Sequence, residues 1–173
     1  MRLARATASR VALSLGLVGF GVLAVGSGLD RLSGQAPGLE RLVPGPFRAQ
    51  AERSAALIAG ARGRRAAALD HARKAVAGDP VDPGAAPLLG AALLLQGDAA
   101  RAEQAFRVSA RLGWRDVPTQ AYWYEAALEA GEMAPAADRL DALLRAHPGF
   151  PGSDALLARI EETPAGRRAL ERR

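Results

Sequence analysis

Three glycines, Gly63, Gly97 and Gly131, stand at intervals of 34 residues and constrain the fold of this chain more than any other feature. A helical pattern follows each of them. Within that pattern a small residue recurs at the same interval: Ala68, Ala102 and Ala136. A fixed period between about 20 and 50 residues is typical of stacked copies of one supersecondary unit. We therefore expect three copies of a two-helix unit.

Composition favours helices over strands. Hydrophobic residues make up 49% of the sequence, but aromatic residues only 5%. Alanine carries much of the apolar fraction, and it combines the best helix propensity with a poor fit to a pleated sheet. The predicted fold class is therefore all-α. Cysteine is absent, which excludes disulfides, a thiolate nucleophile and a cysteine-based metal site.

The predicted helices form three pairs, each joined at one of the three glycines. The pairs are 47–60 with 65–77, 84–96 with 99–112, and 118–130 with 133–146. They make up repeats at 49–82, 83–116 and 117–150, within a repeat domain of 47–150. Asp82, Asp98 and Asp116 are each placed to cap the helix that follows, since a carboxylate accepts from the free N–H groups of a first turn.

This stretch resembles the tetratricopeptide repeat family, over about residues 49–150. The first helices of the first two copies carry a small residue, Ala56 or Gly90, where two helices pack closely. In the second helices, a larger packing residue follows the recurring alanine by four positions in two copies, at Phe106 and Leu140. The resemblance implies an α-solenoid whose first helices line an inner groove.

Several positions depart from the family pattern. Pro80 and Pro148 close the first and third copies, whereas Trp114 replaces the closing proline of the second. The first copy has Ala72 where a bulky residue is usual. Tyr124 occupies the small-residue position of the third copy, where its bulk predicts a tilt or a shift in register of that helix.

The end of the chain, 151–173, is predicted to close the solenoid. A helix over 153–162 places Leu156, Leu157 and Ile160 on one face. A solenoid needs an end-piece with a polar outer face to cover its last apolar surface, and we assign this helix that role. Thr163-Pro164 then breaks the helix, and a short charged segment follows over 165–173.

The beginning of the chain predicts a membrane segment. Residues 11–29 are uncharged and follow Arg2, Arg5 and Arg10. At about 1.5 Å per residue, a helix of this length approaches the roughly 30 Å hydrocarbon core. The positive-inside rule leaves residues 1–10 in the cytoplasm and carries the rest across a bacterial inner membrane into the periplasm.

The competing interpretation of this segment is a cleaved signal peptide, with Ala24-Val25-Gly26 as an acceptable cleavage site. We favour a retained anchor. Both interpretations export the domain, as a single-pass membrane protein or as a secreted periplasmic one. Residues 30–46 are rich in proline and glycine and are predicted to be a linker that holds the domain clear of the bilayer.

The net charge of +5 does not indicate a nucleic-acid partner. Residues 1–46 carry five arginines against Asp30 and Glu40, whereas residues 47–150 hold 13 basic and 12 acidic side chains. A nucleic-acid footprint requires a basic stripe on the folded domain itself. The lipid bilayer and other proteins are the expected partners.

Nothing in the sequence predicts catalysis, a cofactor or a metal site. The only histidines are His71, on a charged helix face, and His147, at a helix end where a cation suits the helix dipole. Neither belongs to a cluster with metal-ligand spacing. No enzyme is expected.

The candidate binding site is the inner groove, which is predicted to be apolar at its centre with acidic groups at one end. It lacks the Lys/Asn set with which some members of the family clamp a terminal carboxylate. The residues expected to line it are Arg53, Leu57, Ala91, Leu94, Leu95, Ala121, Glu125, Leu128 and Glu129.

An aromatic group adds Trp114 and Tyr122 to the candidate residues, because exposed aromatics dominate interface hot spots. Three consecutive helical residues cannot all face inward. We expect Trp123 to be buried, Tyr124 to be partly buried and Tyr122 to lie near the surface. Core packing is the favoured role of the group.

The first copy is predicted to be the least stable of the three. Alanines fill positions where larger side chains would each add about 0.8 kcal/mol per buried CH₂ group. These alanines are Ala55, Ala56, Ala59, Ala68, Ala72 and Ala75.

These features predict a non-catalytic, membrane-anchored scaffold that organises other cell-envelope proteins, in secretion, exopolysaccharide or outer-membrane machinery. One alternative is an accessory subunit of a polysaccharide- or peptidoglycan-acting enzyme, which would require a pocket of acids around Glu125 and Glu129. Another is a structural homo-oligomer with the aromatic group as its interface. The sequence does not determine the oligomeric state.

Overall fold

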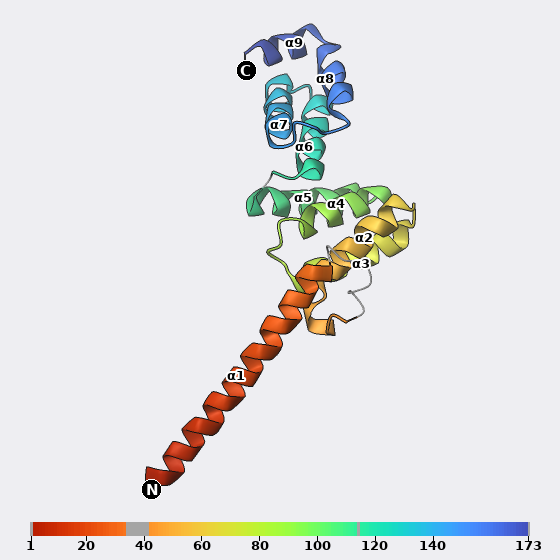
Figure 1. Cartoon of the computed structure of the whole chain (residues 1–173). Coiled ribbons are helices and arrows are strands. Elements are labelled where there is room, and N and C mark those ends of the chain that lie inside the picture. The colour runs from red at the N-terminus through yellow and green to blue at the C-terminus, as the bar shows by residue number, and fades with distance from the viewer. Residues whose placement is uncertain (1, 34–41, 114, 173) are drawn as a thin grey trace.

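The computed structural model describes residues 2–33, 42–113 and 115–172, without the side chains of 2–16 and 46. These residues form nine α-helices and one 3-10 helix, and they include no strand (Figure 1). The elements are α1 (Arg2–Ser33), η2 (Gly45–Phe47), α2 (Ala49–Ala61), α3 (Arg65–Gly78), α4 (Ala85–Leu95), α5 (Ala99–Leu112), α6 (Val117–Glu129), α7 (Met133–Ala146), α8 (Ser153–Glu161) and α9 (Pro164–Glu171).

The middle of the chain is a stack of three helical hairpins, α2/α3, α4/α5 and α6/α7 (Figure 1). The all-α, solenoid-like architecture predicted from the sequence is confirmed. The predicted helix bounds differ from the observed ones by no more than a residue or two, which is within the usual uncertainty of helix ends.

The three glycines end the first helix of each hairpin in the same way. Gly63, Gly97 and Gly131 have φ angles of 69°, 79° and 75°, in the left-handed region where a Cβ would be strained. In each turn the glycine N–H donates to the carbonyl three residues earlier, and the next N–H donates to the carbonyl five residues earlier. This pair of bonds is the Schellman motif, and its threefold recurrence explains the 34-residue period.

Two of the three predicted aspartate caps are present, whereas α4 begins after Gly84 without a side-chain cap. The side chains of Asp98 and Asp116 accept from the backbone N–H groups of Arg101 and Thr119, at 3.1 and 2.8 Å. Asp82 accepts instead from Gly84, at 2.9 Å, in the turn before α4. Each carboxylate therefore satisfies an N–H group that would otherwise lack a partner at a helix start.

The small-residue positions of the first two hairpins allow helices to approach closely. Ala56 and Ala72 are buried between α2, α3 and α4. A Cβ atom added at Gly90 would lie 2.8 Å from the ring of Phe106, so that ring occupies the space that the glycine leaves. Phe106 is 1% exposed and forms the core of the second hairpin with Leu93 and Ala102.

The expected order of burial in the aromatic group was wrong. Tyr124 is fully buried, whereas Trp123 is only half-buried and so is Tyr122. Tyr124 fits because α8 and α9 follow the third hairpin, and the ring packs with Ile160 and Ala169 from these helices. Its hydroxyl donates to the carbonyl of Leu156 at 2.5 Å, so the buried polar atom is satisfied.

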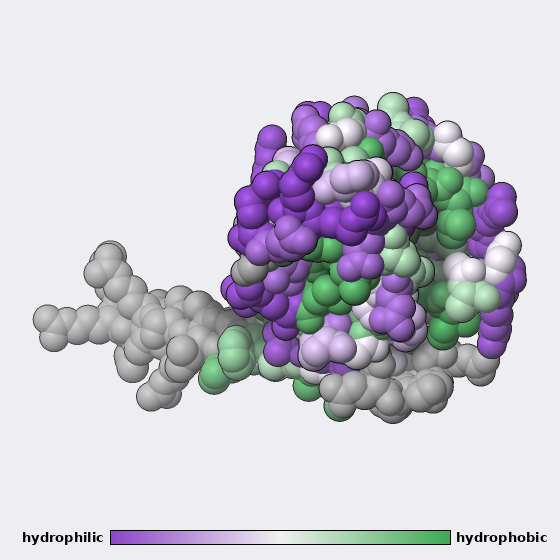
Figure 2. Space-filling model, turned by 90° about the horizontal axis from the view of Figure 1, so that it is seen from above, coloured by the Kyte–Doolittle hydropathy of each residue, from purple (hydrophilic) through white to green (hydrophobic). Residues whose placement is uncertain are grey.

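The C-terminal end contains one helix more than predicted. The segment expected to be a charged tail forms α9, which begins with the side chain of Thr163 accepting from the Gly166 N–H at 2.9 Å. Pro164 stands at the first helical position, where its missing N–H costs nothing. The predicted helix break was therefore a helix start, and α8 and α9 cover the third hairpin together. Seen from this end, the surface is largely hydrophilic, with hydrophobic residues visible between (Figure 2).

Helix α1 projects from the opposite end of the stack (Figure 1). It contains the segment 11–29 and continues through Ser33, so the predicted linker of 30–46 is wrong at its start and also includes the 3-10 helix η2. Within the residues that the structure describes, no helix has both the length and the apolar character needed to cross a membrane.

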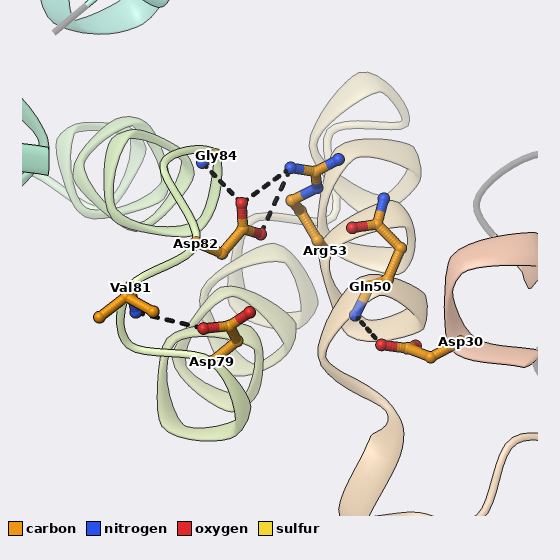
Figure 3. Close-up of polar contacts among 7 residues, drawn as sticks. All are labelled: Asp30, Gln50, Arg53, Asp79, Val81, Asp82 and Gly84. Carbon is orange, nitrogen blue, oxygen red and sulfur yellow. Dashed lines mark hydrogen bonds and ion pairs between the residues drawn. The ribbon is translucent and has the colours of Figure 1, made fainter. Parts of the chain in front are cut away.

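The end of α1 is attached to the first hairpin. The carboxylate of Asp30 accepts from the backbone N–H of Gln50 at 2.9 Å (Figure 3) and from that of Ala51 at 3.0 Å. Helix α2 has no side-chain cap of its own, because its N-cap residue is Arg48. Asp30 thus caps α2 from a distant part of the chain. Nearby, the ring of Phe47 fills the space beside Gly26, where a Cβ would lie 2.5 Å from it.

Candidate binding groove

A groove of about 550 Å³ lies between the second hairpin and α6. Helices α4 and α6 are the first helices of consecutive hairpins, so the groove lies on the side that the repeat pattern predicts. It is lined by Ala91, Leu94, Ala99, Phe106, Pro118, Ala121, Tyr122, Glu125, Ala126 and Glu129.

The apolar floor of the groove results from helix periodicity. Pro118, the neighbours Ala121 and Tyr122, Glu125 and Glu129 recur at spacings of three or four residues and therefore share one face of α6. The Phe106 ring stacks on Tyr122, with ring centroids 4.3 Å apart and an interplanar angle of 16°. The rings of Tyr122 and Trp123 form a T-shaped pair, with centroids 5.1 Å apart and an interplanar angle of 78°.

Two carboxylates stand one helical turn apart on the same face. Glu125 forms an ion pair with Arg159 of α8, at 2.5 Å between Oε2 and Nη1. Glu129 is exposed and has no ion pair among the described residues. The groove therefore combines apolar side chains with two carboxylates on α6.

The pKa of the Tyr122 hydroxyl depends on its burial and on the charges near the groove. Burial raises the pKa of its hydroxyl above the usual value of 10.0, and the nearby negative charge of Glu103 raises the pKa further, with a smaller contribution from Glu129. The positive charge of Arg107 opposes the shift. Removal from water and nearby carboxylates thus both disfavour a further negative charge in the groove.

A smaller cavity of about 210 Å³ adjoins the groove toward the first hairpin. Pro118 lines both spaces, so they are consecutive parts of one surface. The smaller cavity is lined by Arg53, Leu57, Gly84, Pro87, Leu88, Asp116 and Pro118. Most of these side chains are apolar, and Asp116 is engaged as the cap of α6.

Arg53 has a structural partner. Its guanidinium donates to both carboxylate oxygens of Asp82, at 3.2 and 3.3 Å (Figure 3). Asp82 also accepts from the Gly84 N–H and so links α2 to the turn before α4. Because the charge of Arg53 is compensated, this end of the surface does not present an uncompensated cation.

The structure brings most of the predicted binding residues together. Ala91, Leu94, Ala121, Tyr122, Glu125 and Glu129 line the groove, and Arg53 and Leu57 line the adjoining cavity. Leu95 is exposed but lines neither space, and Leu128 packs against the core of the third hairpin. Trp114 lies outside the described residues. The expectation that Leu95 and Leu128 line the groove was wrong, because each stands one position away from a lining residue on its helix.

Four residues that line the groove were not among the candidates predicted from the sequence: Ala99, Phe106, Pro118 and Ala126. Phe106 was assigned to the core of the second hairpin, and it does pack there, but its ring also reaches the groove. Pro118 was assigned only to a helix start. Its position one turn before Ala121 and Tyr122 was the signal that could have placed it on the same face of α6.

The two histidines join helices or loops outside the groove. His71 Nδ1 of α3 lies 2.6 Å from the Glu52 carboxylate of α2, and His147 Nε2 lies 2.7 Å from the carbonyl oxygen of Arg115. In the described part of the chain, no group of three or more histidine or acidic residues could hold a metal ion.

No protein-family model matches the chain, and neither does any curated protein. The likeness to the tetratricopeptide repeat pattern therefore depends on the repeated turns, the hairpin stack and the small-residue positions described above.

Proposed function

We propose that this chain is a non-catalytic tetratricopeptide-like module that binds a segment of another protein in the groove between α4, α5 and α6. The observation that carries the proposal is an open apolar groove of about 550 Å³ whose apolar side chains include Leu94, which remains 42% exposed. Exposed apolar surface that is concave and rimmed by polar groups is characteristic of an interaction site.

The proposal includes attachment to a membrane through residues 11–29. Its support is a run of large apolar side chains on α1, each more than half exposed: Leu17, Val18, Phe20, Val22, Leu23 and Val25. Helix α1 projects from the body of the protein (Figure 1), so burying these apolar side chains requires a surface outside the hairpin stack. The arginines before them favour a cytoplasmic N-terminus and a periplasmic repeat domain, in which the chain would serve as a scaffold for cell-envelope proteins.

The binding proposal can be tested with a pair of matched variants. Leu94 and Val108 are 42% and 45% exposed, but only Leu94 lines the groove. After crosslinking in intact cells and purification from membranes, the wild type and Val108→Glu are expected to retain the same partner bands. Leu94→Glu is expected to lose them, because it places a charge on the apolar floor. Equal recovery with both variants would contradict the proposal.

The membrane proposal has a separate test. A phosphatase that is active only outside the cytoplasm, fused after residue 173, is expected to be active, and the protein is expected to resist extraction from membranes with alkaline carbonate. Activity with release of a shortened chain would support the cleaved-signal alternative. An inactive fusion would contradict export in either form.

A further inference from the structure

The acidic face of α6 suggests the chemistry of the segment that the groove binds. Glu125 and Glu129 both line the groove, but Arg159 compensates only Glu125 among the described residues. Glu129 thus brings an uncompensated negative charge to the edge of an apolar surface. A partner that covers this edge without a cation would desolvate the carboxylate, which costs free energy.

The apolar floor beside Glu129 suits a long basic side chain. Ala91, Leu94 and Tyr122 line the same groove as the carboxylate. Lysine and arginine bury their aliphatic stems along apolar surface and keep the charged head at a polar site. Beside Tyr122, Glu103 is paired with Arg107, so Glu129 is the carboxylate there that lacks an ion-pair partner among the described residues.

The adjoining cavity suits an apolar side chain. Leu57, Pro87 and Leu88 line it, and its one cation, Arg53, is paired with Asp82. Since Pro118 borders both cavities, a single bound segment can occupy them in succession.

We propose that the groove selects a peptide segment with a lysine or arginine next to apolar residues, the cation pairing with Glu129 and an apolar side chain occupying the cavity at Leu57. This inference depends on the proposed function, because it names the class of segment that the groove binds. A membrane surface or a nucleic acid would instead bring phosphates toward Glu125 and Glu129.

The test uses the purified full chain in detergent micelles and a defined set of fluorescent 12-residue peptides. Each peptide has two leucines and one variable position, which is lysine, arginine, glutamine or glutamate, in an otherwise alanine and serine background. All spacings of the three positions are included. Binding is measured by fluorescence polarisation at low and high salt.

The wild type is expected to bind the best lysine or arginine peptides about tenfold more tightly than their glutamine counterparts, which corresponds to about 1.4 kcal/mol. This preference should decrease at high salt, because the pair is exposed. Glu129→Gln is expected to abolish the preference, and Glu129→Lys to transfer it to the glutamate peptides. Glu132→Gln, which removes an exposed carboxylate outside the groove, should leave it unchanged.

Three results would overturn the inference, and they differ in what they say of the proposed function. If the peptides bind in a way that depends on Leu94 but shows no preference for a cation, only the charge selection is wrong. If no peptide binds to the wild type, or if Leu94→Glu binds equally well, the groove itself is not a peptide site. A preference that persists in Glu129→Gln would also overturn the assigned role of Glu129.

Discussion

The first and third hairpins follow the same 34-residue pattern, but they are packed in different ways. In α2/α3 the buried residues are alanines, including Ala56, Ala68 and Ala72, and the helices interlock through small side chains. In α6/α7 the buried core contains Tyr124, Leu140 and Leu143, which are all 0% exposed. The same turn geometry and repeat length are thus compatible with a core of small side chains or with a core of large ones.

The two hairpins also differ in their neighbours. The third is covered by α8 and α9, whose Ile160 and Ala169 complete its core. The first is joined to α1 by the hydrogen bonds of Asp30 to the start of α2. Because buried apolar area provides most of the stability of a domain, we expect the C-terminal half to support the N-terminal half.

The largest expected loss of stability is in the third hairpin, whose core consists of large side chains. Leu140→Ala removes a fully buried side chain and should lower the free energy of unfolding by about 2–5 kcal/mol, since neighbouring side chains fill the resulting cavity only in part. Its counterpart in the first hairpin, Ala72→Gly, should cost about 1 kcal/mol. Urea unfolding of the full chain measures both values. Equal losses of unfolding free energy in the two variants would contradict the proposed difference between the first and third hairpins.

Hydrogen exchange should show the difference without any substitution. We expect backbone amides at 50–78 to exchange at least about tenfold faster than those of α6 and α7, because local opening is easier where less apolar area is buried. Mass spectrometry of exchanged peptides resolves the two regions. Uniform protection along the three hairpins would mean that the alanine packing is as stable as the larger core.

The Tyr124 hydroxyl gives a smaller effect that is specific to the third hairpin. Tyr124→Phe leaves the carbonyl of Leu156 without this partner and should cost about 1–2 kcal/mol. Tyr122→Phe should change stability by less than about 0.5 kcal/mol, because the Tyr122 hydroxyl has no hydrogen bond among the described residues. A loss with Tyr122→Phe as large as that with Tyr124→Phe would contradict this assignment.

The contribution of the Tyr124 hydroxyl to the free energy of unfolding should depend on pH. Burial raises the pKa of Tyr124 above its usual value of 10.0, so the folded state favours the protonated hydroxyl. Its stabilising contribution should be fully present below about pH 10 and should be lost as the pH rises through the shifted pKa. Tyr124→Phe should therefore lose less stability than the wild type between neutral and strongly alkaline pH.

The smallest effect concerns the connection to α1. Asp30→Ala removes two hydrogen bonds to the start of α2 and should cost about 1 kcal/mol. It should also broaden the distribution of distances between spin labels on Leu23 and Val108, which can be placed uniquely because the chain has no cysteine. Asp79→Ala is the control, since among the described residues the Asp79 side chain bonds only to the Val81 N–H, within its own turn (Figure 3). A narrow distribution in Asp30→Ala would show that the contact between Gly26 and Phe47 is sufficient to orient α1.

The repeat pattern could be predicted from the sequence because it depends on local chemistry. A positive φ angle favours glycine, and a helix start favours a carboxylate on a side chain, so Gly97 and Asp98 mark the same turn in the sequence and in the structure. The apolar and acidic residues of α6 could be assigned to one face by helix periodicity alone. Four of the candidate residues line the groove from this face, Ala121, Tyr122, Glu125 and Glu129, and Ala91 and Leu94 line it from α4.

Other features depend on contacts between segments that are distant in the sequence, and only the tertiary structure determined them. Tyr124 is buried because α8 and α9 meet it, and Asp30 caps α2 because α1 continues far enough to reach it. The pairing of Arg53 with Asp82 and of Glu125 with Arg159 leaves Glu129 as the exposed charge at the groove. Local propensities specify the hairpins and their turns, whereas long-range packing decides which side chains remain available to a partner.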